Sequence, residues 1–190
     1  MSIKGKCAIV GLGVTAMGKV YGRSATAFAA EAVQLALDDA GLQKTDIDGL
    51  LVNANMSPEM SIQLQAALGL ENLALLNVMN AYGSTAGTML QYAAMAIDNG
   101  LAQTVVLVYA DDPLKPDKRA GASYSGSGRN VSGMNSLFPA YGYYGANTGY
   151  ALALQRHMHL FGTTSEQLGA IAVAQRQWAL LNPWAQMRTP

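Results

Sequence analysis

The chain has 190 residues, of which 51% are hydrophobic and 13% charged, and its 12 basic and 12 acidic side chains give a formal net charge of zero. This balance, without a long basic cluster, argues against a nucleic-acid-binding surface. No run of about 18 apolar residues occurs, so we expect no membrane span. The N-terminus lacks the layout of a signal peptide, and one cysteine, Cys7, excludes an internal disulfide and a cysteine-based metal site. We therefore expect a soluble, cytoplasmic protein without a bound metal.

Strand-like and helix-like segments alternate along the first part of the chain. The continuous apolar run from Cys7 to Val14 predicts a strand buried on both faces. Ser24 is placed to cap a helix that ends near Ala40, just before Gly41. The following elements are two helices, at 61–68 and 84–99, and three strands, at 48–52, 73–78 and 104–110. Such alternation predicts an α/β fold with a mostly parallel sheet and helices on both faces.

The composition changes after Ala110. Residues 111–149 are rich in Gly, Ser, Pro, Asn and Tyr, which predicts a long loop-rich insert. Helices are expected again at about 146–160 and, from a capping box formed by Thr164 and Gln167, to about residue 180. We therefore divide the chain into a core region, 1–110, and part of an inserted domain, 111–190. Within the core region, the helix at 84–99 is so rich in alanine that we expect it to be buried in the centre of the protein.

Residues 11–16 fit the dinucleotide-binding pattern G-x-G-x-x-A. In that motif the helix begins immediately after the glycines and directs its N-terminus at the pyrophosphate. Here Gly18 and Gly22 delay the helix until about Ser24, and Asn53 stands where the second strand should end in an acidic residue. A tight turn after a strand is the preferred interpretation, and nucleotide binding is kept as an alternative.

The segment from Asn80 to Ala86 joins the third strand to the alanine-rich helix. Free N–H groups and the positive end of the helix dipole favour an oxyanion or a carbonyl oxygen at such a junction. Asparagine is also a good N-cap, so the same residues are compatible with a purely structural turn. From the spacing alone, the structural interpretation is preferred.

This segment, Asn-Ala-Tyr-Gly-Ser-Thr-Ala, resembles the nucleophile segment of thiolases, Cys-Ala-x-Gly-Ser-Thr-Ala. The similarity is closest to the sterol-carrier-protein-X or lipid-transfer-protein branch. Further stretches in matching order resemble the same family: 8–15, 46–50, 150–158, 161–168 and 182–186. The resemblance covers essentially the whole chain. It implies the N-terminal half of a thiolase-like fold, with a mostly parallel five-stranded-type sheet, followed by part of the loop domain.

The resemblance implies acyl-CoA chemistry, but this chain departs from the family at the nucleophile. Thiolases form an acyl-enzyme on the cysteine, whereas Asn80 has an amide nitrogen whose lone pair is delocalised, so no acyl-enzyme forms there. Some relatives of this branch lack the cysteine and cleave β-hydroxyacyl-CoA by a retro-aldol reaction, which needs a base and enolate stabilisation instead. We expect Asn80, Tyr82, Gly83 and Ser84 to contact the substrate. Tyr144 falls at a pocket-lining position of thiolases; packing of the loop insert is its alternative role.

The resemblance also indicates partners. A CoA thioester is expected as substrate, without a further cofactor. Thiolases form dimers, so we expect a homodimer or hetero-oligomer, and a small partner with an OB-fold and a zinc ribbon often accompanies this branch. A non-catalytic subunit of a hetero-oligomeric acyltransferase is the main alternative to the retro-aldolase, and a nucleotide-binding fragment is the weaker one.

Overall fold

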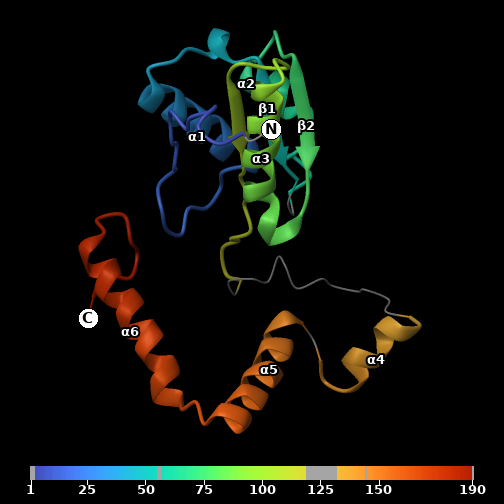
Figure 1. Cartoon of the computed structure of the whole chain (residues 1–190), viewed down its shortest axis with the longest axis vertical. Helices are drawn as coiled ribbons and strands as arrows, with labels where there is room; N and C mark the ends of the chain where they lie inside the picture. Colours follow the sequence, from blue (N-terminus) through green and yellow to red (C-terminus); the bar gives the residue numbers. More distant parts are fainter. Residues whose placement is uncertain (1–2, 55–56, 119–131, 144, 190) are drawn as a thin grey trace. The chain divides into compact units, whose positions relative to one another are not determined.

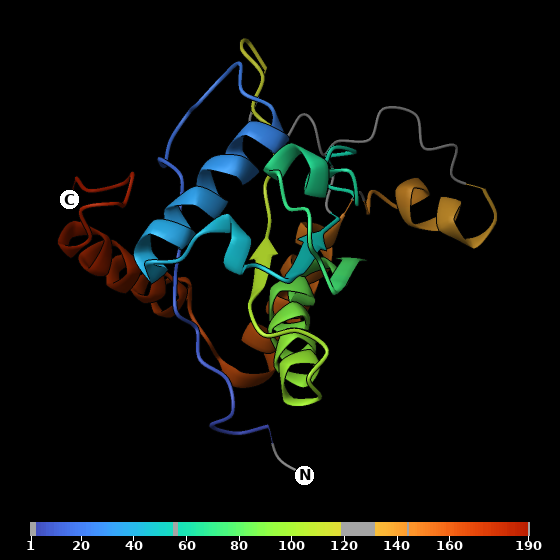
Figure 2. The same cartoon turned by 90° about the horizontal axis from the view of Figure 1, so that it is seen from above.

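The computed structural model describes residues 3–54, 57–118, 132–143 and 145–189 (Figures 1 and 2). The chain divides into two compact units, Met1–Ser125 and Gly126–Pro190, which are described separately. None of the described helices combines the length and the hydrophobicity that a membrane span requires.

The first unit is built on a parallel sheet of three strands in the order β2-β1-β3. Leu51 of β1 lies opposite Asn77 of β2 on one side and Leu107 of β3 on the other. The strands are β1 (Gly49–Asn53), β2 (Leu75–Met79) and β3 (Val105–Val108), and the helices are α1 (Ala25–Ala40), α2 (Leu64–Leu68) and α3 (Thr85–Asp98). These elements confirm the predicted α/β alternation and the parallel sheet.

Helices cover both faces of this sheet. Successive residues of a strand point to opposite faces, so neighbouring residues of β1 pack into different cores. Leu50 and Val52 of β1 pack into one core with α1 and α2. Leu51, between them in sequence, packs into a second core with α3. All three strand residues are fully buried, which explains why β1 is a continuous apolar run rather than an alternating one.

The ends of α1 are fixed by its caps. Ser24 Oγ accepts a hydrogen bond from Ala27 N at 3.1 Å, and Gly41 ends the helix in the left-handed conformation with φ 67°. In the first turn of α1, Thr26 donates both its N–H and its Oγ1–H to Glu59 Oε2, each at 2.8 Å. These bonds hold the pKa of Glu59 below its usual value, the bond from the Thr26 N–H being the largest cause. The predicted cap and stop of this helix are therefore confirmed.

The predicted opening strand, from Cys7 to Val14, is wrong for this structure. The segment is extended but is not part of the sheet, and its apolar side chains are uncovered: Ile9 is 78% and Leu12 72% exposed. It lies on α1 instead. A Cβ on Gly13 would come within 1.8 Å of the carbonyl oxygen of Ala32, so only glycine allows this approach. The segment does not form a strand because no described strand lies beside it to pair with its backbone.

Helix α3 is not central in this structure, contrary to the prediction. Met89 and Ala93 face the sheet and are buried, whereas Leu90 is 46% and Met95 40% exposed. Only one face of the helix is therefore covered by the described residues. The sheet likewise has three described strands, where the resemblance implied a five-stranded type.

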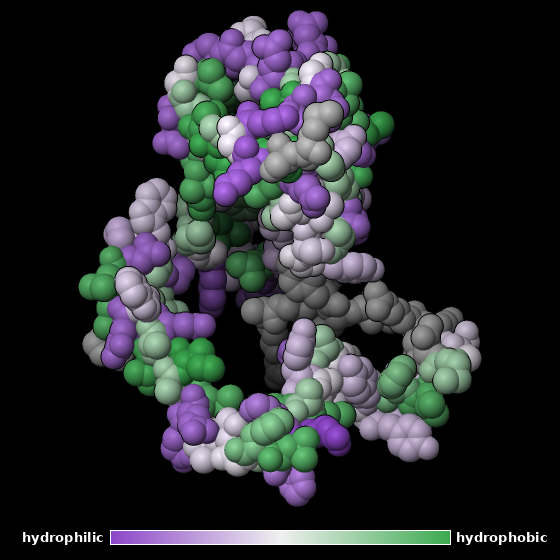
Figure 3. Space-filling view, viewed as in Figure 1, coloured by the Kyte–Doolittle hydropathy of each residue, from purple (hydrophilic) through white to green (hydrophobic). Residues whose placement is uncertain are grey.

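The second unit contains helices α4 (Met134–Ala140), α5 (Ala146–Phe161) and α6 (Ser165–Leu181). The predicted capping box of α6 is present, because Thr164 Oγ1 accepts from Gln167 N while Gln167 Oε1 accepts from Thr164 N. Helix α4 was not predicted, since it lies inside the loop-rich stretch and contains Pro139. No described residue of α5 or α6 is buried, and apolar side chains appear on the surface of this unit (Figure 3).

Candidate functional site

The candidate site is the turn that leads from β2 into α3. After Met79 the chain enters Asn80 and Ala81, then a single 3-10 turn, Tyr82–Ser84, and then α3 from Thr85. Parallel strands direct their carboxyl ends to one edge of a sheet, where ligand sites of α/β proteins are usually built. Asn80, Tyr82, Gly83 and Ser84 are all exposed there.

The side chain of Asn80 is oriented by its own turn. Its Oδ1 accepts a hydrogen bond from the backbone N–H of Tyr82 at 3.1 Å. An amide oxygen must face this donor, so the amide nitrogen Nδ2 is directed away from it. Nδ2 makes no hydrogen bond to any described residue. The side chain therefore presents two unused N–H donors at the exposed end of β2.

Buried Thr85 holds the turn in place. Its Oγ1 accepts from Ala81 N at 2.9 Å and donates to the carbonyl of Tyr82 at 2.7 Å. Ser84 Oγ adds a bond to the carbonyl of Ala81 at 2.7 Å. Thr85 is only 1% exposed, so its hydroxyl serves the backbone and is shielded from solvent. Sequence reasoning missed this residue; its position at the start of a helix, where hydroxyls bond to turns, was the available signal.

Tyr82 combines strain with exposure. It is one of two described non-glycine residues with positive φ, at 50°, and its side chain is 91% exposed. This conformation costs a non-glycine residue on the order of 1–2 kcal/mol. Next to it, a Cβ built on Gly83 meets no atom within 4 Å. The turn is thus open to a ligand on the side of Gly83 and carries an aromatic side chain beside that opening.

The structure brings four of the five predicted site residues together in one turn, and Tyr144 lies outside the described residues. The roles of these residues in binding stay predictions. The turn also lies at the N-terminal end of α3, where free N–H groups favour a partial negative charge. In the described ranges, no group of three His, Cys, Asp or Glu side chains is placed to hold a metal.

The glycine pattern at 11–16 does not form a phosphate loop. Gly11 and Gly13 serve the close approach to α1, and the helix begins only at Ala25, after the Ser24 cap. These features argue against a dinucleotide-binding loop, while the preferred interpretation, a tight turn after a strand, is wrong in its strand because residues 7–14 belong to no described strand.

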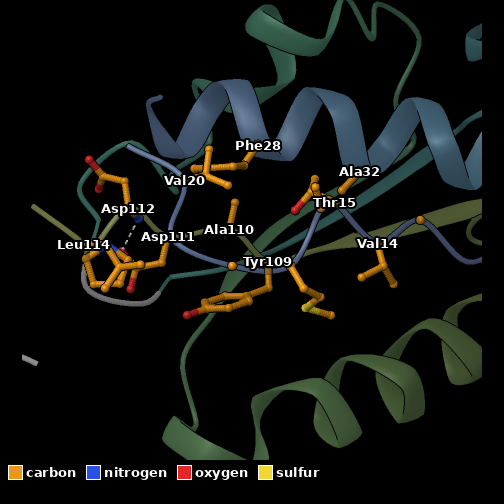
Figure 4. A pocket seen from close by; sticks show the side chains of 15 residues that line it. Val14, Thr15, Val20, Phe28, Ala32, Tyr109, Ala110, Asp111, Asp112 and Leu114 are labelled. Atoms are coloured by element: carbon orange, nitrogen blue, oxygen red, sulfur yellow. Dashed lines mark hydrogen bonds between the residues drawn. The ribbon is translucent and has the colours of Figure 1, made fainter. Parts of the chain in front are cut away.

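A hollow of about 450 Å³ follows these glycines (Figure 4). One side is the stretch 13–18, the other is the stretch 109–114 that follows β3, and Phe28 and Ala32 of α1 line it as well. The residues of the candidate turn, 80–84, do not line it. The hollow and the turn are therefore separate features of the first unit.

Comparisons with known proteins support the thiolase-like part of the resemblance seen in the sequence. No protein-family model matches the chain. It is 36% identical over 186 residues to the 17-hydroxy-3-oxo-4-pregnene-20-carboxyl-CoA lyase of Mycobacterium tuberculosis (strain H37Rv), covering 96% of this chain and 48% of the relative. It is 35% identical over 193 residues to the steroid side-chain-cleaving aldolase of Thermomonospora curvata, covering 96% and 47%.

A solved structure, the Ltp2-ChsH2(DUF35) aldolase, superposes with a TM-score of 0.75 at 30% identity, over 95% of this chain and 45% of that one. The α/β fold is therefore thiolase-like, as predicted. The chain spans about half the length of the curated relatives it matches.

Proposed function

We propose that this chain supplies part of the active site of a lyase that cleaves a carbon–carbon bond in a β-hydroxyacyl-CoA thioester by a retro-aldol reaction. The observation that carries the proposal is Asn80, an amide at the thiolase nucleophile position whose Nδ2 is free to donate. The two similar proteins are a CoA-ester lyase and an aldolase by name, which supports the same chemistry. We also propose that the chain belongs to the sterol-carrier-protein-X or lipid-transfer-protein branch.

The reaction needs a donor where Asn80 stands. A base removes the proton of the β-hydroxyl, the bond between the α and β carbons breaks, and its electron pair moves into the thioester carbonyl. The β carbon leaves as an aldehyde or ketone, and the enolate takes a proton at its α carbon to give a shortened acyl-CoA. Negative charge develops on the thioester oxygen, and a preorganised N–H donor stabilises it. Asn80 Nδ2 has this role in our proposal, with the N-terminal end of α3 behind it.

The other turn residues contact the substrate. Gly83 leaves room for the thioester to approach the backbone, and Ser84 flanks it. Tyr82 is the only residue of the turn from Asn80 to Thr85 with a group that ionises. Its exposed phenol is placed to accept or share the hydroxyl proton, so we assign it a contact with the β-hydroxyl. Tyr144 lines the acyl pocket in this proposal, and the CoA thioester is the substrate without a further cofactor.

A partner subunit is part of the proposal. The name of the similar solved structure joins two proteins, Ltp2 and ChsH2. Because the second unit here has no buried residue in α5 and α6, its apolar side chains require cover from elsewhere. We propose a homodimer or hetero-oligomer that includes a small protein with an OB-fold and a zinc ribbon.

The same observation favours a second candidate, a non-catalytic subunit that stabilises a catalytic homologue. A chain with Asn80 in place of a nucleophile and large uncovered apolar faces fits that role as well. The two candidates differ in ligand binding, because only the lyase must bind a β-hydroxyacyl-CoA.

The test uses the full-length protein. It is titrated calorimetrically with acetyl-CoA and with a longer β-hydroxyacyl-CoA, and products are followed by mass spectrometry. The lyase predicts binding of the longer ester and release of an aldehyde or ketone in equal amount to a shortened acyl-CoA. A Tyr82→Phe variant should keep binding and lose most of the turnover. Absence of binding to either ester would leave the non-catalytic subunit as the better account.

A further inference from the structure

Helix α3 ends on an asparagine–glycine pair. Asn99 is the cap residue, with φ −94° and ψ 6°, and Gly100 follows in the left-handed conformation with φ 71°. Gly100 N donates to the carbonyl of Ile97 at 3.0 Å. Leu101 N donates to the carbonyl of Ala96 at 2.9 Å. Together these bonds form the turn that commonly ends a helix at a glycine, and the left-handed φ explains why glycine stands at position 100.

The glycine leaves its neighbour open to a reaction within the chain. Asn99 is the only asparagine of the sequence that is followed by glycine. Because glycine has no Cβ, no side chain shields its backbone nitrogen from the side-chain carbon Cγ of the asparagine before it. Both residues are exposed, so water and hydroxide reach them. Asparagine is also one of the thermally labile residues of proteins.

We propose that Asn99 is a site of spontaneous deamidation. The backbone nitrogen of Gly100 loses its proton to hydroxide and attacks Cγ of Asn99. The N–Cγ bond forms, the Cγ–Nδ2 bond breaks, and Nδ2 leaves as ammonia after it takes a proton from water. Water then opens the resulting five-membered imide at either of its carbonyl carbons. One product has aspartate at position 99, and the other has isoaspartate, in which the backbone runs through the side-chain carbon.

The hydrogen bonds of the cap control this reaction. In the closed cap, Gly100 N is bonded to the carbonyl of Ile97, and Asn99 Nδ2 donates to the carbonyl of Met95 at 2.7 Å. Both bonds must break before the nitrogen reaches Cγ, so the reaction occurs when the last turn of α3 frays. Helix ends open more readily than the core of a fold. The deamidation rate therefore measures opening at this end of α3.

The start of the chain holds the same end of α3 closed. Lys6 Nζ forms an ion pair with Asp98, the residue before Asn99. Cys7 Sγ donates to the carbonyl of Ala94 at 3.6 Å. These contacts join the helix to a segment outside it, so they oppose fraying of the last turn. Loss of the ion pair should speed the reaction.

A related pair, Asp48–Gly49, is held closed by the sheet. Aspartate before glycine forms the same imide by loss of water, so this pair is an internal comparison. Gly49 is buried in β1 and its N–H donates to the carbonyl of Thr104 at 3.1 Å. The carboxylate of Asp48 accepts from the N–H groups of Gln103 and Thr104. We expect no isoaspartate at position 48 while the protein is folded.

Either product weakens the end of α3. A carboxylate cannot donate to the carbonyl of Met95, and its charge lies at the negative end of the helix dipole. Isoaspartate also lengthens the backbone by one carbon before Gly100, which disrupts the bond from Leu101 to Ala96. The urea midpoint of the protein should therefore fall as the reaction proceeds.

The test is incubation of the protein in mildly alkaline buffer, folded and in urea. Peptide mapping by mass spectrometry locates the mass gained when an amide becomes an acid, and isoaspartyl methyltransferase labels isoaspartate. We expect the gain at Asn99 before any other asparagine, and faster at higher pH because the attacking nitrogen must lose its proton. The folded protein should react roughly 10-fold to 100-fold more slowly than the protein in urea, the ratio expected for two hydrogen bonds that must break.

Two results would overturn the proposal. One is reaction in urea with none in the folded protein, because the cap would then never open for attack. The other is earlier reaction at a different asparagine of the folded protein. Equal rates in the folded protein and in urea would overturn the control by the cap.

Matched variants give a second readout. Lys6→Met removes the ion pair, and Lys19→Met changes an exposed lysine that forms no ion pair with the described residues. Only Lys6→Met should speed deamidation, by about twofold to fivefold, the range that a surface ion pair contributes. Asn99→Gln should abolish the mass gain and the label, because its longer side chain would have to close a larger ring. Equal rates in the two lysine variants would contradict the role of Lys6, and label at position 99 in Asn99→Gln would contradict the mechanism.

Discussion

Asn80 Oδ1 and the backbone N–H of Tyr82 are joined by a hydrogen bond of 3.1 Å, and Tyr82 on the donor side of that bond has φ 50°. The bond therefore does two things at once. It directs Asn80 Nδ2 outward, and it supports a strained residue that carries an exposed phenol. A substitution at Asn80 changes the donor, the acceptor or both, and suitable variants separate the two functions.

Asn80→Asp removes the donor and keeps the acceptor for Tyr82. In the full-length protein we expect a fall in kcat of about 100-fold to 1000-fold, because a lost oxyanion donor costs about that much and the new carboxylate repels the developing enolate. The melting temperature should stay close to that of the unsubstituted protein. The rate of aldehyde or ketone release measures the effect, with Asn80→Ala, which lacks donor and acceptor, as the comparison. An Asn80→Asp protein with unchanged kcat would show that Nδ2 is not the donor.

Tyr82→Gly should stabilise the chain. Glycine adopts φ 50° without the steric cost paid by tyrosine, and the tyrosine side chain, 91% exposed, has little packing to lose. We expect a gain of about 1 kcal/mol in the free energy of unfolding, or about 2–4 °C in Tm for a chain of this size. Tyr82→Ala keeps the strained backbone and is the control, expected within about 0.5 kcal/mol of the original. A glycine variant no more stable than the alanine variant would contradict strain at this position.

Local sequence signals predicted most of the first unit. The Ser24 cap and Gly41 determine the ends of α1, and the apolar runs at β1, β2 and β3 stand out because both faces of the sheet are covered. The same signal, a continuous apolar run, wrongly predicted a strand at Cys7–Val14. An apolar run predicts that a segment is able to be a buried strand, but pairing needs a neighbour, and no described segment provides one. The partial exposure of α3 has the same cause. Whether the outer face of this helix is buried depends on a neighbouring segment, and no described segment covers it.

The site was located by resemblance and not by physical reasoning from the residues. Spacing alone favoured a structural role for Asn80 in capping and turning the chain, and in the structure its Oδ1 accepts from Tyr82 N within the turn, while Thr85 binds the turn from inside. Whether a threonine faces the core or the solvent depends on the packing of α3, which the local sequence does not specify. The positive φ of Tyr82 was also beyond sequence reasoning, since tyrosine has no preference for it.

Two glycines should respond to alanine with opposite signs. At Gly13 a new Cβ would lie 1.8 Å from the carbonyl oxygen of Ala32, so the segment must move away from α1, at a cost of about 1–3 kcal/mol. At Gly87, inside α3, nothing lies within 4 Å of a new Cβ, and alanine should stabilise the helix by about 0.5–1 kcal/mol.

Urea unfolding of the 190-residue chain measures both signs. Hydrogen exchange adds a local readout for Gly13→Ala, because Leu12 N bonds to Asp39 only while the segment stays on α1. Its exchange should quicken in that variant and stay unchanged in Gly87→Ala. Unchanged exchange at Leu12 together with unchanged stability would show that the segment does not lie on α1.

The Thr26–Glu59 contact should make stability depend on pH in acid. Hydrogen bonds from Thr26 N and Oγ1 lower the pKa of Glu59 in the folded chain relative to the unfolded chain. A lowered folded pKa means that the contact stabilises the fold fully above the unfolded pKa, and that this contribution disappears as the pH falls through the folded pKa.

Glu59→Gln keeps the shape of the side chain without its charge. It should lower the urea midpoint at pH 7 and approach the midpoint of the original chain in strong acid, where Glu59 itself is protonated. Glu71→Gln is the control, because Glu71 forms no hydrogen bond with the described residues. A difference between Glu59→Gln and the original chain that stays constant from pH 7 into strong acid would show that the charge of Glu59 is not what stabilises the start of α1.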